Sequence, residues 1–225
     1  MDYCANPNAS AKAEAYPAAS RNVISLAAHR ACQERLRTWP EFAETPLVSL
    51  PHVARACGVA EVFAKVEGGR CGLGSFKALG GALAVDVLAA SRAANTDDAG
   101  DDTTAVDMTV STASAGNHGM AVAWGAARLN MRCIVYLHAG VGEAIEARMQ
   151  ATGAETRRVA GNYDDSVAAC RDESLENGWQ VVQDTSAEGY EDIPKQIWQV
   201  GAPCGGARCG WVGWVVHTHT HTHSC

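Results

Sequence analysis

DMTVSTASAGNHGMAVAWGAARL, residues 107–129, gives the clearest indication of the fold. Its first part, DMTVSTA (107–113), is rich in β-branched residues and predicts a buried strand. SAGNHG (114–119) follows as a turn, and the remainder predicts a helix to about Leu129. A strand that leads directly into a helix is the repeating unit of a parallel sheet, so the stretch indicates an α/β protein.

Further strands and helices alternate around this stretch. Strands are predicted at EVFAKVE (61–67), RCIVYLH (132–138), ETRRVA (155–160) and QVVQD (180–184). Helices are predicted within 20–38, 53–57, 76–94, 141–152 and 163–177, and TPLVSL (45–50) is predicted to be extended. Because strands and helices alternate from residue 61 onward, we expect one parallel sheet with flanking helices. Its ligand-binding loops should lie where the strands end.

The composition excludes several classes of protein. With 18 Lys and Arg against 25 Asp and Glu, the chain of 225 residues has a net charge of −7, which argues against nucleic-acid binding. No apolar run approaches the roughly 18 residues that a membrane-spanning helix needs, so no membrane partner is expected. The first 20 residues lack the pattern of a secretory signal, and nine irregularly spaced cysteines indicate reduced thiols. These features predict a cytoplasmic protein.

A glycine-rich loop precedes the first lysine of interest. In GLGSFKALGG (72–81), Ser75 is expected to be the N-cap of a helix that begins near Lys77. The helix dipole disfavours a cation at this end, which suits a lysine that must form a Schiff base. From the spacing alone, an exposed helical lysine is the simpler interpretation.

The loop STASAGNHG (111–119) has the features of an anion pocket. Backbone N–H groups at the start of a helix bind a carboxylate or phosphate, and Asn117 and His118 would add side-chain donors. A plain strand-to-helix turn and a structural histidine are the alternatives.

A third loop, QDTSAEGY (183–190), places an acid at the end of a strand. Asp184 is positioned to act as a general base, but Asp184 or Ser186 could equally cap the helix that follows. The cysteines form no CxxC pair with partners at zinc-binding spacing, so no metal site is predicted.

Together, these loops resemble pyridoxal-phosphate enzymes of the tryptophan-synthase β/serine-dehydratase superfamily. GSFKALGG (74–81) resembles the segment whose lysine bonds to the cofactor, and STASAGNHG resembles the loop that binds the substrate carboxylate. Within the superfamily, the chain is most similar to the diaminopropionate ammonia-lyases, over about residues 43–199. The similarity rests on TPLVSL with CGV (57–59), the run from Lys65 to Lys77, GNHGMAVAWGAARL (116–129), and NYDDSV (162–167) with VVQDTSAEGYEDIP (181–194).

The resemblance implies a fold-type II enzyme and a role for each site residue. Lys77 would hold pyridoxal 5'-phosphate, Asn117 would hydrogen-bond the cofactor's 3-oxygen, and Asp184 would remove the α-proton of an L-substrate. The residues implied to line the substrate carboxylate are Ser114, Ala115, Gly116 and His118. The implied reaction is α,β-elimination of 2,3-diaminopropionate to pyruvate and ammonia, in a protein that is a homodimer at full length.

Two positions depart from the family pattern. The family loop reads T-D-G-N-H-G, with an Asp used on the D-isomer, whereas this chain has Ala115. We therefore expect the L-isomer to be favoured. The family's K-D-E segment is Lys65-Val66-Glu67 here, which removes one acid beside the site.

The last 26 residues differ from the rest of the sequence. Residues 200–225 hold one charged residue, Arg208, and contain HTHTHTH (217–223), which a CA-dinucleotide repeat would encode. We predict three segments: a lead-in and helix (1–42), the N-terminal portion of the enzyme with its small α/β lobe (43–199), and a non-native tail read from a retained intron (200–225). This arrangement implies truncation before a second lobe is complete. A metal site on the alternate histidines is the other interpretation of the tail.

Two further functions stay open. A serine or threonine dehydratase is favoured by Ala115 and opposed by the stretch 181–194. A non-catalytic fragment is the third hypothesis, because a single lobe would leave its domain interface exposed.

Overall fold

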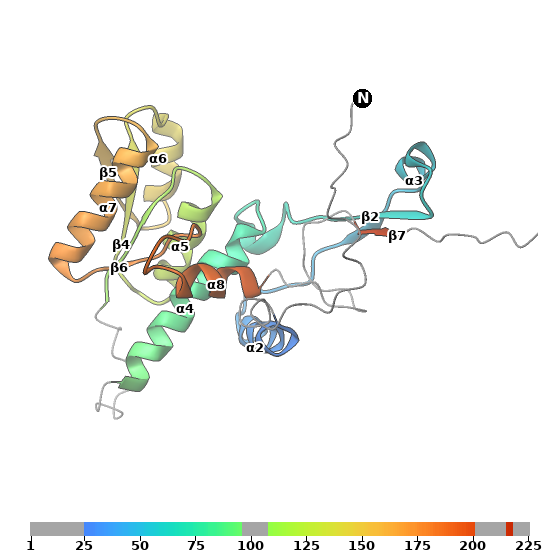
Figure 1. Ribbon diagram of the computed structural model, residues 1–225, viewed down its shortest axis with the longest axis horizontal. Coiled ribbons are helices and arrows are strands. Elements are labelled where there is room, and N and C mark those ends of the chain that lie inside the picture. Colours follow the sequence, from blue (N-terminus) through green and yellow to red (C-terminus); the bar gives the residue numbers. More distant parts are fainter. Residues whose placement is uncertain (1–24, 96–107, 201–214, 218–225) are drawn as a thin grey trace, which may run out of the picture.

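A computed structural model describes residues 25–95, 108–200 and 215–217 (Figure 1). Residues 1–24 of the predicted lead-in and helix (1–42), and most of the predicted tail, lie outside the described residues. Four parallel strands form the central sheet in the order β5-β4-β3-β6. They are β3 (Val110–Ala113), β4 (Cys133–His138), β5 (Glu155–Val159) and β6 (Gln180–Val181). The parallel sheet is confirmed, although β6 is shorter than the predicted strand at 180–184.

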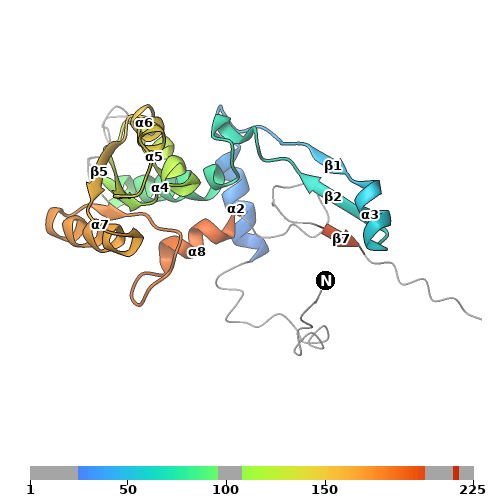
Figure 2. The ribbon, with the colours of Figure 1, turned by 90° about the horizontal axis from the view of Figure 1, so that it is seen from above.

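Helices cover both faces of this sheet. Helices α5 (Asn117–Arg128) and α6 (Glu143–Gln150) lie on one face, and α7 (Tyr163–Asn177) lies on the other (Figure 2). The two central strands are buried almost throughout, and their side chains alternate between the faces. In β4, Ile134 and Tyr136 join the core beneath α7, whereas Val135 and Leu137 join the core on the α5 side.

The strand order creates a crevice beside β3. The chain runs from β3 to β4 to β5 in one direction across the sheet, and β6 is then added on the opposite side of β3. Such a reversal is a topological switch point, and ligands of open parallel sheets bind outside the carboxyl ends of the strands at this place. The loops that follow β3 and β6 meet there.

Three further helices pack against α5 and against one another. The helix α4 (Lys77–Asn95) packs along α5, and a Cβ on Gly81 would lie only 2.8 Å from the Ala121 side chain. Without a side chain at Gly81, the two helices can approach closely enough to bring their first residues together. Helix α8 (Asp192–Gln199) packs on α4, and α2 (Leu26–Leu36) contacts both α4 and α8.

The segment at 61–67 does not join the parallel sheet, so this part of the sequence prediction is wrong. β2 (Glu61–Lys65) pairs antiparallel with β1 (Leu47–Ser49), and α3 (Pro51–Cys57) connects the two strands. Both views show this antiparallel sheet apart from the parallel one (Figures 1 and 2). A strand in a parallel sheet is buried on both faces, whereas only Val62 is fully buried in β2.

One described piece of the tail also belongs to the antiparallel sheet. β7 (Val215–His217) pairs antiparallel with β2, with Glu61 opposite His217. The predicted origin of the tail and the predicted boundaries at residues 42 and 199 stay predictions.

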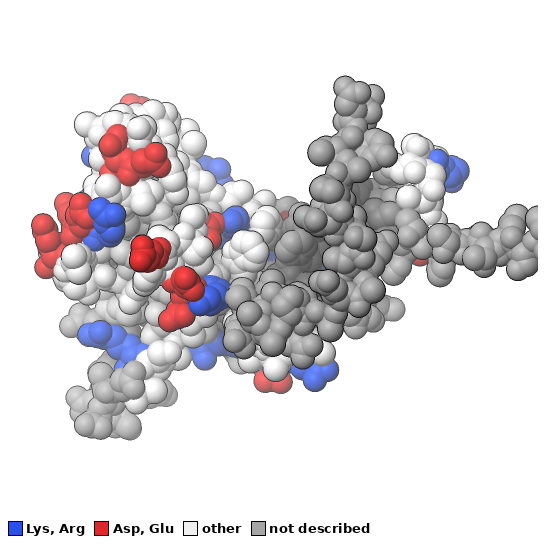
Figure 3. All heavy atoms as spheres, in the orientation of Figure 1, with Lys and Arg blue, Asp and Glu red and all other residues white. Residues whose placement is uncertain are grey.

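The described surface carries charges of both signs. Acidic and basic side chains lie next to one another over the α/β lobe in the view of Figure 3. Within the described part of the chain, no helix is both long and apolar enough to cross a membrane.

Candidate active site

The crevice brings together the two residues predicted to be catalytic. Lys77 begins α4, and its Nζ lies 2.5 Å from Oδ2 of Asp184, although 107 positions separate them in sequence. About a third of the Lys77 side chain (34%) and a quarter of the Asp184 side chain (25%) are exposed. Glu191, not Asp184 or Ser186, is the residue that precedes α8, and it makes no side-chain cap. The geometry therefore favours a site acid over a helix cap at Asp184.

A buried ion pair anchors the loop that leads to Lys77. Arg70 donates to the Glu67 carboxylate at 2.6 and 2.7 Å, and it also reaches the Ala43 carbonyl and the Thr45 hydroxyl. Both charged side chains are almost fully buried, at 3% and 6% exposure. A single turn of 3₁₀ helix, η2 (Arg70–Gly72), follows from this anchor. The pair was not predicted from the sequence, although Glu67 and Arg70 stand three residues apart and this spacing was an available signal.

The start of α4 is fixed locally. The Lys77 backbone N–H donates to the Ser75 hydroxyl at 3.2 Å, which confirms Ser75 as the expected cap. The sequence resemblance predicts that Val66 replaces an acid beside the site, and Val66 is 44% exposed.

His118 is buried next to the Lys77–Asp184 ion pair. Its side chain is 4% exposed, its Nε2 lies 2.9 Å from the Val182 carbonyl, and its Nδ1 lies 3.8 Å from Asp184 Oδ2. Burial lowers the pKa of His118 below its ordinary value, although Asp184 and the Val182 carbonyl act in the opposite direction. The ring is therefore neutral near pH 7. Because a carbonyl oxygen only accepts, Nε2 carries the hydrogen and Nδ1 is a bare acceptor.

Opposing effects act on the Asp184 carboxyl. Burial raises its pKa, but the His118 ring, where it is protonated, and the hydrogen bond and charge of the Lys77 ammonium together lower it by more, so the pKa lies below its ordinary value. Asp184 is thus ionised at neutral pH and can accept a proton. His118 Nδ1 has no hydrogen-bond partner, so a protonated Asp184 would find an acceptor there.

The predicted substrate loop lies at the end of β3. Ser114 and Ala115 are half-buried, whereas Gly116 and Asn117 are exposed at the start of α5. The Gly116 N–H donates to the Ser114 hydroxyl at 3.3 Å. A Cβ on Gly119 would lie 2.3 Å from the Ser114 carbonyl oxygen, so only glycine lets the helix start this close to the strand end.

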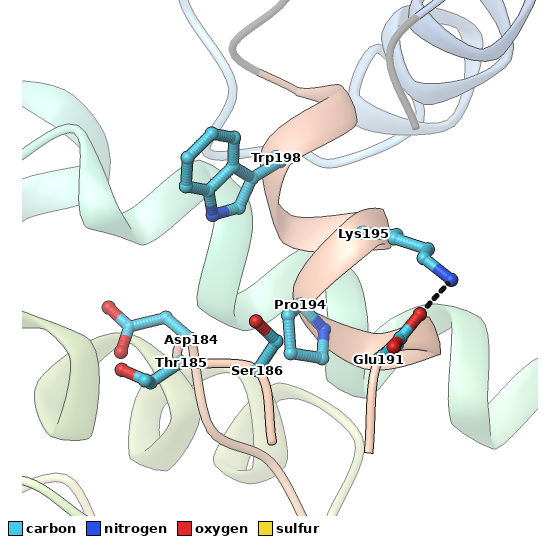
Figure 4. A pocket seen from close by; sticks show the side chains of 7 residues that line it. All are labelled: Asp184, Thr185, Ser186, Glu191, Pro194, Lys195 and Trp198. Atoms are coloured by element: carbon cyan, nitrogen blue, oxygen red, sulfur yellow. Dashed lines mark hydrogen bonds and ion pairs between the residues drawn. The ribbon is translucent and has the colours of Figure 1, made fainter. Parts of the chain in front are cut away.

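A hollow of about 390 Å³ opens beside Asp184. The loop after β6 forms one wall and α8 forms the other, with the Trp198 indole standing above the Asp184 carboxylate (Figure 4). Its lining residues are Asp184, Thr185, Ser186, Glu191, Pro194, Lys195 and Trp198. This volume is within the range of small-molecule sites. The residues that α8 contributes were not predicted from the sequence, because only the fold brings α8 to the crevice.

The described residues fit pyridoxal phosphate at its reactive end. An accessible lysine amine lies at the crevice, the exposed N-terminus of α5 faces the same place, and His118 presents an unpartnered buried nitrogen. An amine, an anion-binding helix start and a nearby acid form a donor set that suits this cofactor and an amino-acid substrate.

Comparison with known proteins identifies relatives with the same features. Residues 38–213 match the family described as pyridoxal-phosphate dependent enzyme. The diaminopropionate ammonia-lyase of Salmonella typhimurium is 36% identical over 171 residues, which are 71% of this chain and 42% of that protein. The chain therefore spans less than half the length of this curated relative.

Solved structures show the same fold. Diaminopropionate ammonia-lyase from Escherichia coli in apo form superposes with a TM-score of 0.72 at 31% identity, covering 83% of this chain and 51% of that chain. The same enzyme in complex with D-serine gives a TM-score of 0.73 at 31% identity, with 83% and 48% covered. With the family match extending over more than half of its sequence, this chain belongs to the pyridoxal-phosphate-dependent enzymes.

Proposed function

We propose that this chain carries part of the active site of a lyase that eliminates ammonia from 2,3-diaminopropionate. The observation that carries the proposal is the 2.5 Å contact between Lys77 and Asp184 at the switch point of the sheet. The similarity to diaminopropionate ammonia-lyases supports the choice of substrate.

The proposed roles follow from the geometry. Lys77 holds the cofactor, and Asn117 at the start of α5 hydrogen-bonds the cofactor's 3-oxygen. Pyridoxal phosphate, when bound, supplies a sink for the electron pair left at the substrate Cα. Asp184 accepts the α-proton, and His118 Nδ1 accepts a hydrogen bond from the resulting carboxyl group. Overall, diaminopropionate and one water give pyruvate and two molecules of ammonia.

The loop 114–117 supports a preference for the L-isomer. Ser114, Ala115, Gly116 and the helix start would hold the substrate carboxylate, leaving the α-hydrogen of an L-substrate toward Asp184. Ala115 cannot take a proton, so the acid that the family uses on the D-isomer is missing.

Restoring that acid tests the stereochemical part of the proposal. Ala115→Asp should raise the rate on the D-isomer by about 10²-fold or more, the usual contribution of a positioned general base, and should alter the rate on the L-isomer less. Pyruvate release from each pure isomer is the measurement, with Ala115→Asn as the control of similar size. An equal effect of both substitutions on the D-isomer would contradict the assignment.

A dehydratase acting on serine or threonine is the second candidate. Ala115 favours it, because ordinary dehydratases share a residue without an acid here. Both candidates use Lys77 and Asp184, so only the substrate separates them.

The test combines cofactor binding with substrate choice. The purified chain mixed with pyridoxal phosphate should develop the visible absorbance of a Schiff base, which Lys77→Ala and Lys77→Arg should both abolish. Lys77→Arg keeps the charge beside Asp184, so its loss of absorbance reports the amine and not the ion pair. Pyruvate formation is then compared for L- and D-diaminopropionate and L-serine, and 2-oxobutanoate formation for L-threonine. A folded chain that gives no absorbance would support the hypothesis of a non-catalytic fragment.

A further inference from the structure

Backbone pairing between β3 and β6 ends just before the site. The last main-chain hydrogen bond between these segments runs from the Val182 N–H to the Ser111 carbonyl at 2.8 Å. Beyond it, β3 continues to Ala113 and the substrate loop, while the other segment turns away toward Asp184. Diverging strands leave buried backbone groups that need other partners.

The Gln183 side chain spans this divergence. Its Nε2 donates to the Ala113 carbonyl at 3.1 Å, and its Oε1 accepts from the Thr112 hydroxyl at 2.8 Å. Gln183 is 8% exposed and Thr112 is fully buried. The side-chain amide of Gln183 can donate through its nitrogen and accept through its oxygen, and both groups are hydrogen-bonded here.

The Gln183 backbone is held as well. Its N–H donates to the Tyr190 hydroxyl at 2.7 Å, and that hydroxyl donates to the Val181 carbonyl at 3.1 Å. Gln183, the residue immediately before Asp184, is therefore held by hydrogen bonds to both its backbone and its side chain.

We propose that Gln183 is a positioning residue, which holds Asp184 at a fixed place relative to the substrate loop that begins after Ala113. The inference rests on the proposed function, because it acts through Asp184 and the α-proton that Asp184 removes. A displacement of about 1 Å at a reacting group can lower a rate by about 10²-fold. Lys77 makes no contact with Gln183 in the described hydrogen-bond network, so cofactor attachment should not depend on it.

Two substitutions separate positioning from stability. Gln183→Met keeps the length of the side chain and removes both hydrogen bonds, and Thr112→Val removes the donor to Oε1 with little change in shape. The matched control is Ser174→Ala. The Ser174 hydroxyl, on α7, forms a buried hydrogen bond of 2.7 Å with the Ser111 hydroxyl. Ser111 lies on β3, as Thr112 does, but its side chain is away from both loops.

A third substitution supplies a rescue. In Gln183→Glu, an ionised carboxylate accepts from Thr112 but cannot donate to Ala113, whereas the protonated acid restores both bonds. Burial favours the protonated form, so function should return as the pH falls from about 8 to about 6. The titratable groups that face this position are Asp184, His118, Tyr163 and Tyr190. Burial raises the pKa of both tyrosines, so they stay neutral in that range, and it lowers the pKa of His118, which favours its neutral form.

The experiment follows exchange of the α-proton of L-diaminopropionate with D₂O, by NMR, using the full chain loaded with pyridoxal phosphate. We expect Gln183→Met to retain cofactor absorbance and to exchange about 10²-fold more slowly, with a smaller loss in Thr112→Val. Ser174→Ala should exchange at the wild-type rate, and Gln183→Glu should recover as the pH falls while Gln183→Met does not.

A second readout is independent of the cofactor. Hydrogen–deuterium exchange of the free chain should show faster amide exchange at 113–117 and 183–187 in Gln183→Met than in Ser174→Ala. Failure of the wild-type chain to take up pyridoxal phosphate would refute the proposed function, while the amide exchange would still test the link between the loops. Unchanged amide exchange, or α-proton exchange within about twofold of wild type in Gln183→Met, would overturn the inference.

Discussion

Asp184 Oδ2 lies 2.5 Å from Lys77 Nζ and 3.8 Å from His118 Nδ1, and we propose that this carboxylate is the base. Asp184→Asn should lower α-proton exchange of L-diaminopropionate by about 10²- to 10⁴-fold, because the amide cannot accept the proton. Cofactor attachment at Lys77 should persist. NMR in D₂O measures the exchange, and the exposed acid Asp192, changed to Asn, is the control. Equal rates in Asp184→Asn and wild type would show that another group removes the proton.

His118 makes stability depend on pH. Its folded pKa is lowered by burial, so the unfolded chain binds a proton that the folded chain does not once the pH falls below about 6.5. The free energy of unfolding should therefore decrease as the pH falls from about 6.5 toward the folded pKa, and should be insensitive to this group above about pH 7.5. Urea unfolding at stepped pH measures this dependence. His118→Gln should flatten the slope in that window, and an unchanged slope would show that another group is responsible.

The sequence predicted which residues belong to the site better than it predicted their burial and hydrogen bonds. The motifs around Lys77 and Asp184 were sufficient to predict that both lie at one site. That His118 donates to Val182 and presents a bare Nδ1 depends on burial between α5 and the loop after β6, which no local pattern encodes.

At the scale of elements, the buried pair of Glu67 and Arg70 determines the path of the loop before α4. Arg70→Met should lower the free energy of unfolding by about 3–5 kcal/mol, because it leaves a buried carboxylate without its partner. Urea denaturation measures the loss. The double substitution Glu67→Leu/Arg70→Met should recover most of it, since no buried charge remains. A double variant as unstable as the single one would contradict this account.

Element types were predictable, but one pairing was not. The short helix predicted at 53–57 and the long helix predicted at 163–177 are confirmed, and each is followed by a glycine, Gly58 or Gly178, in the left-handed region. β2 was assigned to the wrong sheet because the alternation of strands and helices along the chain predicts that a segment is a strand but does not predict which strand it pairs with. Its pairing with β1 depends on α3, which lets the two strands fold back antiparallel.

At the scale of the whole molecule, apolar side chains are exposed around the crevice. Phe76 beside Lys77 is 47% exposed, and Trp198 above the hollow is 59% exposed. The chain spans 42% of the Salmonella relative, so the activity, the homodimer and the cytoplasmic location are predictions for the whole protein.

Covalent capture of the cofactor identifies the lysine that binds it. The chain is incubated with pyridoxal phosphate, reduced with borohydride, digested and mapped by mass spectrometry, with circular dichroism confirming that it is folded. The account predicts a single pyridoxyl group on the peptide that contains Lys77, and its absence from Lys77→Arg. A folded chain labelled equally at Lys65 and Lys195, or not labelled at all, would contradict it.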